Sequence, residues 1–91
     1  MFTIWKYTLS LGDVRLIAHI PEPGALVACQ ASGDDVSLWF TVDPELPGRR
    51  RVFEAVGTGM GLLPGNADYV GTAQVCSGRL VLHVFERLDS N

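Results

Sequence analysis

The 91-residue chain has little charge, few cysteines and histidines, and no long apolar run. Only 19% of its residues are charged, and the formal net charge of -3 is opposite in sign to the basic face of a general nucleic-acid binder. No apolar run approaches the ~20 residues of a membrane-spanning helix, and the start MFTIWKYTLS lacks a signal-peptide pattern. These absences predict a cytoplasmic protein that binds neither membranes nor nucleic acid in general.

The two cysteines and two histidines do not have the spacing of a metal site. Cys29, Cys76, His19 and His83 form no C-x-x-C or H-x-x-x-H pair. Both cysteines lie in strand-like runs, which favours buried free thiols over a disulfide in a reducing cytoplasm. We therefore expect no metal ion and no cofactor.

Signatures of catalysis are missing as well. There is no G-x-S-x-G elbow and no cysteine-nucleophile motif. Thr72 and His83, expected to face each other across two strands, come nearest to a catalytic dyad, but such pairs usually pack and hydrogen-bond. Asp34 and Asp35 lie at an expected turn, where acidic residues are common. The sequence predicts a protein that is not an enzyme and has no catalytic residues.

Alternation of apolar and polar residues with a period of two runs through most of the chain and predicts an all-β fold. The length allows one modest core, so we expect a single β domain over residues 1–91. Its architecture would be a compact antiparallel sandwich or partly open barrel of about seven strands built from hairpins. With 47% hydrophobic residues, some apolar surface is expected to lie between subunits of a homo-oligomer.

Three hairpins are predicted to supply six of the strands. They join residues 3–11 to 14–20 through Gly12-Asp13, residues 25–31 to 36–42 through Gly33-Asp34, and residues 69–76 to 79–86 through Ser77-Gly78. The first would pair Leu11 with Val14, Leu9 with Leu16, Tyr7 with Ala18 and Trp5 with Ile20. In each hairpin the register set by the turn gathers apolar side chains on one face, which supports the pairing.

The remaining strand and loop are less strongly patterned. Residues 49–56, RRRVFEAV, read as a seventh strand whose mixed faces favour an edge position. Residues 57–68 are expected to form a long loop that includes most of the glycine-rich stretch VGTGMGLLPG.

That glycine-rich stretch, Val56 to Gly65, has two interpretations. Its backbone N–H groups could form an anion-binding nest beside the arginine run. Alternatively the glycines only let the loop turn, which the absence of a phosphate-loop motif favours. The candidate ligand-binding residues are Gly57, Thr58, Gly59, Gly61, Arg49, Arg50, Arg51 and, as an aromatic platform, Trp39.

A second group of candidates is a partner surface. Large apolar residues fall on the outer faces of the predicted hairpins, where they would contact a protein or a flat ligand, or belong to a larger core. These residues are Trp39, Leu26, Phe85 and Ile17.

Short matching pieces along nearly the whole chain resemble a family of small proteins of tailed bacteriophages and prophages that has no assigned activity. They are Ile4-Trp5-Lys6-Tyr7, Leu38-Trp39 with Val42-Asp43-Pro44, Gly57-Thr58-Gly59, Tyr69-Val70-Gly71-Thr72 and His83-Val84-Phe85-Glu86. The resemblance implies a non-enzymatic phage accessory protein that acts in counter-defence by binding, with sequestration of a nucleotide-like immune signal favoured. The alternatives are an inhibitor that binds a host protein and a minor structural or assembly component of the phage.

Overall fold

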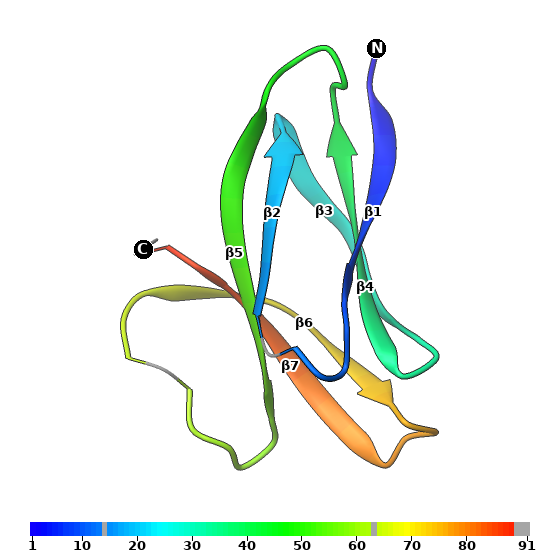
Figure 1. Cartoon of the computed structure of the whole chain (residues 1–91), viewed down its shortest axis with the longest axis vertical. Coiled ribbons are helices and arrows are strands. Elements are labelled where there is room, and N and C mark those ends of the chain that lie inside the picture. Colours follow the sequence, from blue (N-terminus) through cyan, green and yellow to red (C-terminus); the bar gives the residue numbers. More distant parts are fainter. Residues whose placement is uncertain (14, 63, 89–91) are drawn as a thin grey trace.

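Two antiparallel β-sheets pack face to face in the computed structural model, which describes residues 1–13, 15–62 and 64–88 (Figure 1). The strands are β1 (Thr3–Leu9), β2 (Arg15–Pro21), β3 (Pro23–Ser32), β4 (Asp35–Val42), β5 (Gly48–Gly57), β6 (Ala67–Val75) and β7 (Leu80–Arg87). One sheet has the order β1-β4-β3 and the other β2-β5-β7-β6. The predicted all-β sandwich is confirmed. In the described ranges no helix is long and apolar enough to cross a membrane.

The core lies between the sheets and follows from the alternation in β4. Val36, Leu38, Phe40 and Val42 are each at most 1% exposed and all point toward the other sheet. Phe40 meets Phe53 of β5 there, with ring centroids 5.6 Å apart. Burying apolar side chains from both sheets in one layer is the main source of stability in such a sandwich.

The predicted first hairpin is wrong, because its two strands lie in different sheets. β1 pairs with β4, and β2 pairs with β5. A tight turn, in which the Asp13 N–H donates to the Ser10 carbonyl at 2.9 Å, takes the chain from one sheet to the other. Two strands that face each other across a core each have their apolar residues on one face, as two paired strands do. The alternation of apolar residues therefore does not distinguish the two arrangements. The predicted Leu11–Val14 pair includes Val14, which lies outside the described residues.

The other two hairpins are confirmed near their turns. Cys29 is opposite Leu38 in the second, and Ala73 is opposite Leu82 in the third, as predicted. Farther from the turns, register shifts between Leu26 and Ala28 and between Tyr69 and Gly71 move the pairing by one residue. These irregularities were not predicted, because an extra residue leaves most of a short alternating pattern intact.

The predicted edge position of residues 49–56 is also wrong. β5 lies between β2 and β7, and its residues Val52 to Ala55 are buried on both faces. Its one acidic residue there, Glu54, is only 4% exposed because it pairs with Arg87 of β7. The charge of Glu54 therefore belongs to an internal ion pair and does not indicate that one face of the strand is exposed to solvent. The loop that follows is shorter than predicted, since β5 continues to Gly57 and β6 begins at Ala67.

Candidate functional site

A cavity of about 390 Å³ opens at one end of the sandwich, where β2 and β7 end and β5 begins. The arginine run supplies much of its wall. The lining residues, called the arginine cleft from here on, are Ile20, Glu22, Pro23, Gly24, Arg49, Arg50, Arg51, Val52, Glu86, Arg87 and Leu88. Four arginines and two glutamates line the cleft, and because Glu54 behind the wall pairs with Arg87, one positive charge remains in excess, although the chain as a whole is acidic.

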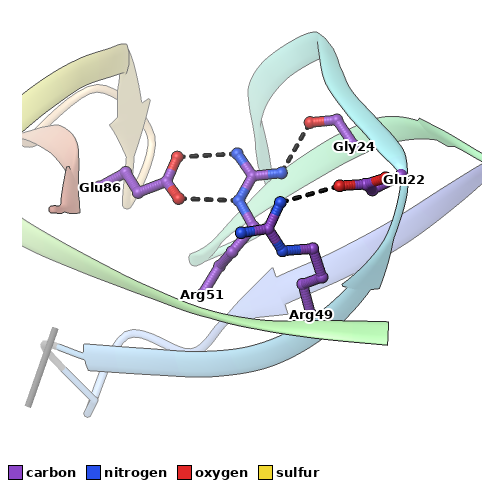
Figure 2. Close-up of polar contacts among 5 residues, drawn as sticks. All are labelled: Glu22, Gly24, Arg49, Arg51 and Glu86. Carbon is purple, nitrogen blue, oxygen red and sulfur yellow. Dashed lines mark hydrogen bonds and ion pairs between the residues drawn. The ribbon is translucent and has the colours of Figure 1, made fainter. Parts of the chain in front are cut away.

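Arg51 is held by three hydrogen bonds to Glu86 and Gly24 (Figure 2). Its Nε and Nη2 donate to the two carboxylate oxygens of Glu86, both at 2.7 Å, and its Nη1 donates to the Gly24 carbonyl at 2.6 Å. The guanidinium also lies over the rings of Phe40 and Phe53, 5.0 and 5.5 Å from their centroids. Such a forked pair fixes the group in one orientation. Arg51 therefore shapes the cleft and joins the two sheets, since Gly24 belongs to β3.

Arg49 and Arg50 are much more accessible than Arg51. Arg49 donates to Glu22 at 2.8 Å (Figure 2). The side chains of Arg49 and Glu22 are both more than half exposed. Arg50 has no ion-pair partner among residues 1–13, 15–62 and 64–88, and it is exposed. Since exposed ion pairs contribute ~0–1 kcal/mol, Arg49 can exchange its carboxylate for another anion at small cost. Both residues line the cleft, and as neighbours in a strand they reach it from opposite faces of β5.

Arg87 contributes to the wall in another way. Its side chain is 8% exposed and pairs with Glu54 at 3.0 Å. It also donates a hydrogen bond to the Pro64 carbonyl, which ties the β5–β6 connection to the sheet. Removing charges from water is costly unless they are paired, so this residue is a structural support for the cleft.

The glycine-rich stretch lies away from the arginine cleft. Gly57 ends β5, whereas Arg51 is near its start, so roughly 20 Å of extended strand separate them. A turn follows Gly57, with the Met60 N–H donating to the Gly57 carbonyl at 3.0 Å. Leu63, in the same stretch, lies outside the described residues. The predicted ligand-binding arginines and glycines are thus divided between the two ends of β5, and Trp39, predicted with them, lies on β4.

A chain of side-chain hydrogen bonds joins the glycine-rich stretch to the outer face of the four-stranded sheet. His83 Nε2 lies 2.7 Å from Thr58 Oγ1, and His83 Nδ1 lies 3.0 Å from Thr72 Oγ1. Thr72 Oγ1 in turn lies 2.6 Å from the hydroxyl of Tyr69. Thr72 and His83 are opposite each other in the register, as predicted. The chain fastens the turn to the sheet, and none of these four residues lines the arginine cleft.

The predicted partner surface is divided between the two sheets. Trp39 of β4 alternates with the buried residues and so faces outward from the three-stranded sheet, where it is partly exposed opposite Ala28. Ile17 and Phe85 belong to the other sheet, and the Phe85 ring packs edge-on against Tyr69 with centroids 5.7 Å apart. Leu26 lies at the irregular part of β3 and is opposite Phe40. These residues do not form one continuous surface.

Burial changes the acidity of two groups near the core. It raises the pKa of the Cys29 thiol, which packs against β6. It also raises the pKa of the Tyr7 hydroxyl, with the nearby charge of Arg51 acting in the opposite direction. Tyr7 donates to the His19 carbonyl at 3.2 Å and so links the two sheets. Both cysteines are free and partly buried, where the sequence predicted buried free thiols.

The acidic partners in the arginine cleft were not found from the sequence. Glu22 and Glu86 are 27 and 35 residues from the arginines that they bind. The only local signal was Glu86, an acidic residue next to Phe85 near the end of β7. It could have suggested a buried partner for a cation.

Comparison with known families gives one match over the whole chain. A family model described as a domain of unknown function, DUF7352, matches residues 1–91. No solved structure matches the chain.

Proposed function

We propose that this chain, which belongs to the DUF7352 family of domains of unknown function, binds a small anionic ligand in its arginine cleft and does not transform it. The observation that supports this proposal is the presence of three consecutive arginines on one cavity. Arg51 and Glu86 would form its rigid wall, and Arg49 and Arg50 would contact the anion. Binding at two accessible guanidinium groups suits phosphate or another multivalent oxyanion.

The size and lining of the cleft favour an organic phosphate over a bare inorganic anion. A volume of about 390 Å³ falls within the range of small-molecule sites, roughly 300 to 1,000 Å³. Ile20, Val52 and Leu88 also line the cleft, and of these three Leu88 offers an exposed apolar side chain beside the arginines. A ligand that carries both a charged group and a flat or apolar group, such as a nucleotide, would use both kinds of wall.

The proposed biological setting comes from the sequence resemblance to small proteins of bacteriophages and prophages. In an infected cell, a binding protein of this kind would act as a counter-defence factor by sequestering a nucleotide-like immune signal. The protein would be cytoplasmic in that setting. In this proposal the ligand is held in the arginine cleft, and not by the glycine-rich stretch and Trp39.

The proposal is tested by titrating the purified protein with inorganic phosphate, cyclic mononucleotides, cyclic dinucleotides and ADP-ribose, using calorimetry and thermal unfolding. We expect at least one nucleotide to bind and to raise the melting temperature, because a ligand at 100 times its Kd stabilises by ~2.7 kcal/mol. Arg49→Ala and Arg50→Ala should each weaken its binding tenfold or more.

Arg79→Ala is the matched control, because it removes the same charge from the exposed β6–β7 turn, outside the cleft. Its Kd should stay within about twofold of the wild-type value. Absence of binding by every compound, or equal losses in all three variants, would contradict the proposal.

A further inference from the structure

The four edge strands of the sandwich differ in how they are protected. β3 and β6 each contain an irregularity in register, and they pack against each other at Cys29 and Gly71. β2 carries Arg15 and His19 and ends in Pro21, which has no N–H to donate. Bulges, charges and proline are the usual devices that keep a sheet edge from pairing with another strand.

β1 lacks most of these devices. It pairs with β4 over seven consecutive residues without a register shift, and it contains one charged residue, Lys6. β1 forms one margin of its sheet, and within the described ranges β4 is its only paired neighbour (Figure 1). Apolar side chains gather on and just before it: Phe2 is 65% exposed, Ile4 54% and Trp5 40%. A regular, apolar edge of this kind is a template for another strand.

We infer that β1 pairs antiparallel with β1 of a second copy, so that two three-stranded sheets join into one six-stranded sheet. The occupant is a strand because the free edge of β1 offers main-chain N–H and C=O groups at strand spacing. We assign a second copy as the occupant because β1 has a single charged residue, Lys6, and can pair with itself about a two-fold axis without opposing like charges. This interface is independent of the proposed ligand site.

Two-fold pairing of β1 with itself limits the register. A two-fold axis perpendicular to the sheet places residues from the same face opposite each other, so the two residue numbers in every pair have an even sum. Centring the axis on Lys6 would oppose two like charges, which is destabilising. Centring it on Trp5 places Trp5 opposite Trp5 of the partner and Lys6 opposite Ile4. The second register has an aromatic pair and no charge conflict.

Sedimentation of the purified full chain over a range of concentrations tests the interface. We expect a wild-type dimer, and Ile4→Lys should shift the monomer–dimer midpoint tenfold or more toward monomer because it opposes Lys6 of the partner. Adding Lys6→Glu to Ile4→Lys should restore the dimer, because each lysine then opposes a glutamate. Val27→Lys adds the same charge at an exposed residue of β3, at the opposite margin of the same sheet, and should leave the dimer intact.

Several results would overturn the inference. A monomeric wild type would do so, as would an Ile4→Lys dimer of unchanged affinity or a strand captured only from a foreign peptide. Failure of the double variant to restore the dimer would exclude the register centred on Trp5. If Ile4→Lys does not fold, hydrogen exchange of the wild type decides: protection of the amides of residues 3–7 must rise with protein concentration.

Discussion

Gly71 shows how a single missing side chain sets the distance between two sheets. A Cβ atom at this position would lie 2.7 Å from Cys29 Cβ and 2.9 Å from Cys29 Sγ. Contacts this short cannot be accommodated without movement of the backbone, because Cys29 Cβ is itself fixed to its strand. The glycine is therefore required for the close approach of β6 and β3, and not for a turn.

At the residue scale, Gly71→Ala should lower the free energy of unfolding by about 1 to 3 kcal/mol through overpacking. Gly12→Ala is the control, because an added Cβ there has no atom within 4 Å, and it should change stability by less than about 0.5 kcal/mol. Urea denaturation followed by circular dichroism measures both. Equal stabilities of the two variants would show that β3 and β6 are not in such close contact.

At the element scale, the position of β5 in the centre of its sheet depends on an ion pair. Glu54 and Arg87 lie on adjacent strands, and their side chains are 5% and 8% exposed. A central strand can carry a charge only when a neighbour compensates it. Because of this pair, β5 can be covered on both faces although it has arginines at one end and Glu54 in its middle.

Glu54→Gln should therefore destabilise the fold by on the order of 3 kcal/mol, because a neutral amide replaces the buried carboxylate that pairs with Arg87. Glu22→Gln removes the same charge from the exposed pair with Arg49 and should cost less than about 1 kcal/mol. Thermal unfolding of the two variants compares them directly. Similar melting temperatures would contradict the burial of the first pair.

At the scale of the whole molecule, the two sheets share one core and should unfold together. Phe40 of one sheet and Phe53 of the other are in contact, and Arg51 binds Glu86 in its own sheet and Gly24 in the opposite sheet. Cooperative unfolding without intermediates is the expected behaviour of a domain of this size.

The positions of the tryptophans allow a direct test of this cooperativity. Trp5 and Trp39 both belong to the three-stranded sheet, whereas circular dichroism reports on all strands. At a fixed protein concentration, the urea midpoints from fluorescence and circular dichroism should coincide within experimental error. A lower midpoint by fluorescence would indicate that the three-stranded sheet separates first.

Much of the fold could be predicted from local patterns, and the errors have a common cause. The hairpins around Gly33 and Ser77 were predicted correctly near their turns, because a short turn forces the flanking strands together. The segment around Gly12 has the same pattern but joins two sheets. For the candidate site, the sequence indicated the arginines, yet it could not show that Glu22 and Glu86 neutralise two of them or that Gly57 lies far away.

The sequence by itself determined where the strands lie and, for the strands of the hairpin patterns, which side is apolar, since both follow from a period of two; the two buried faces of β5 did not follow from it. The tertiary structure decided which strands share a sheet, because an apolar face is buried equally well beside a neighbour or opposite one. The tertiary structure also decided which arginines are accessible. Side chains adjacent in the chain point to alternate faces of β5. Only the packing of β2, β3 and β7 around them makes Arg51 part of the wall of the cleft and leaves Arg49 and Arg50 accessible.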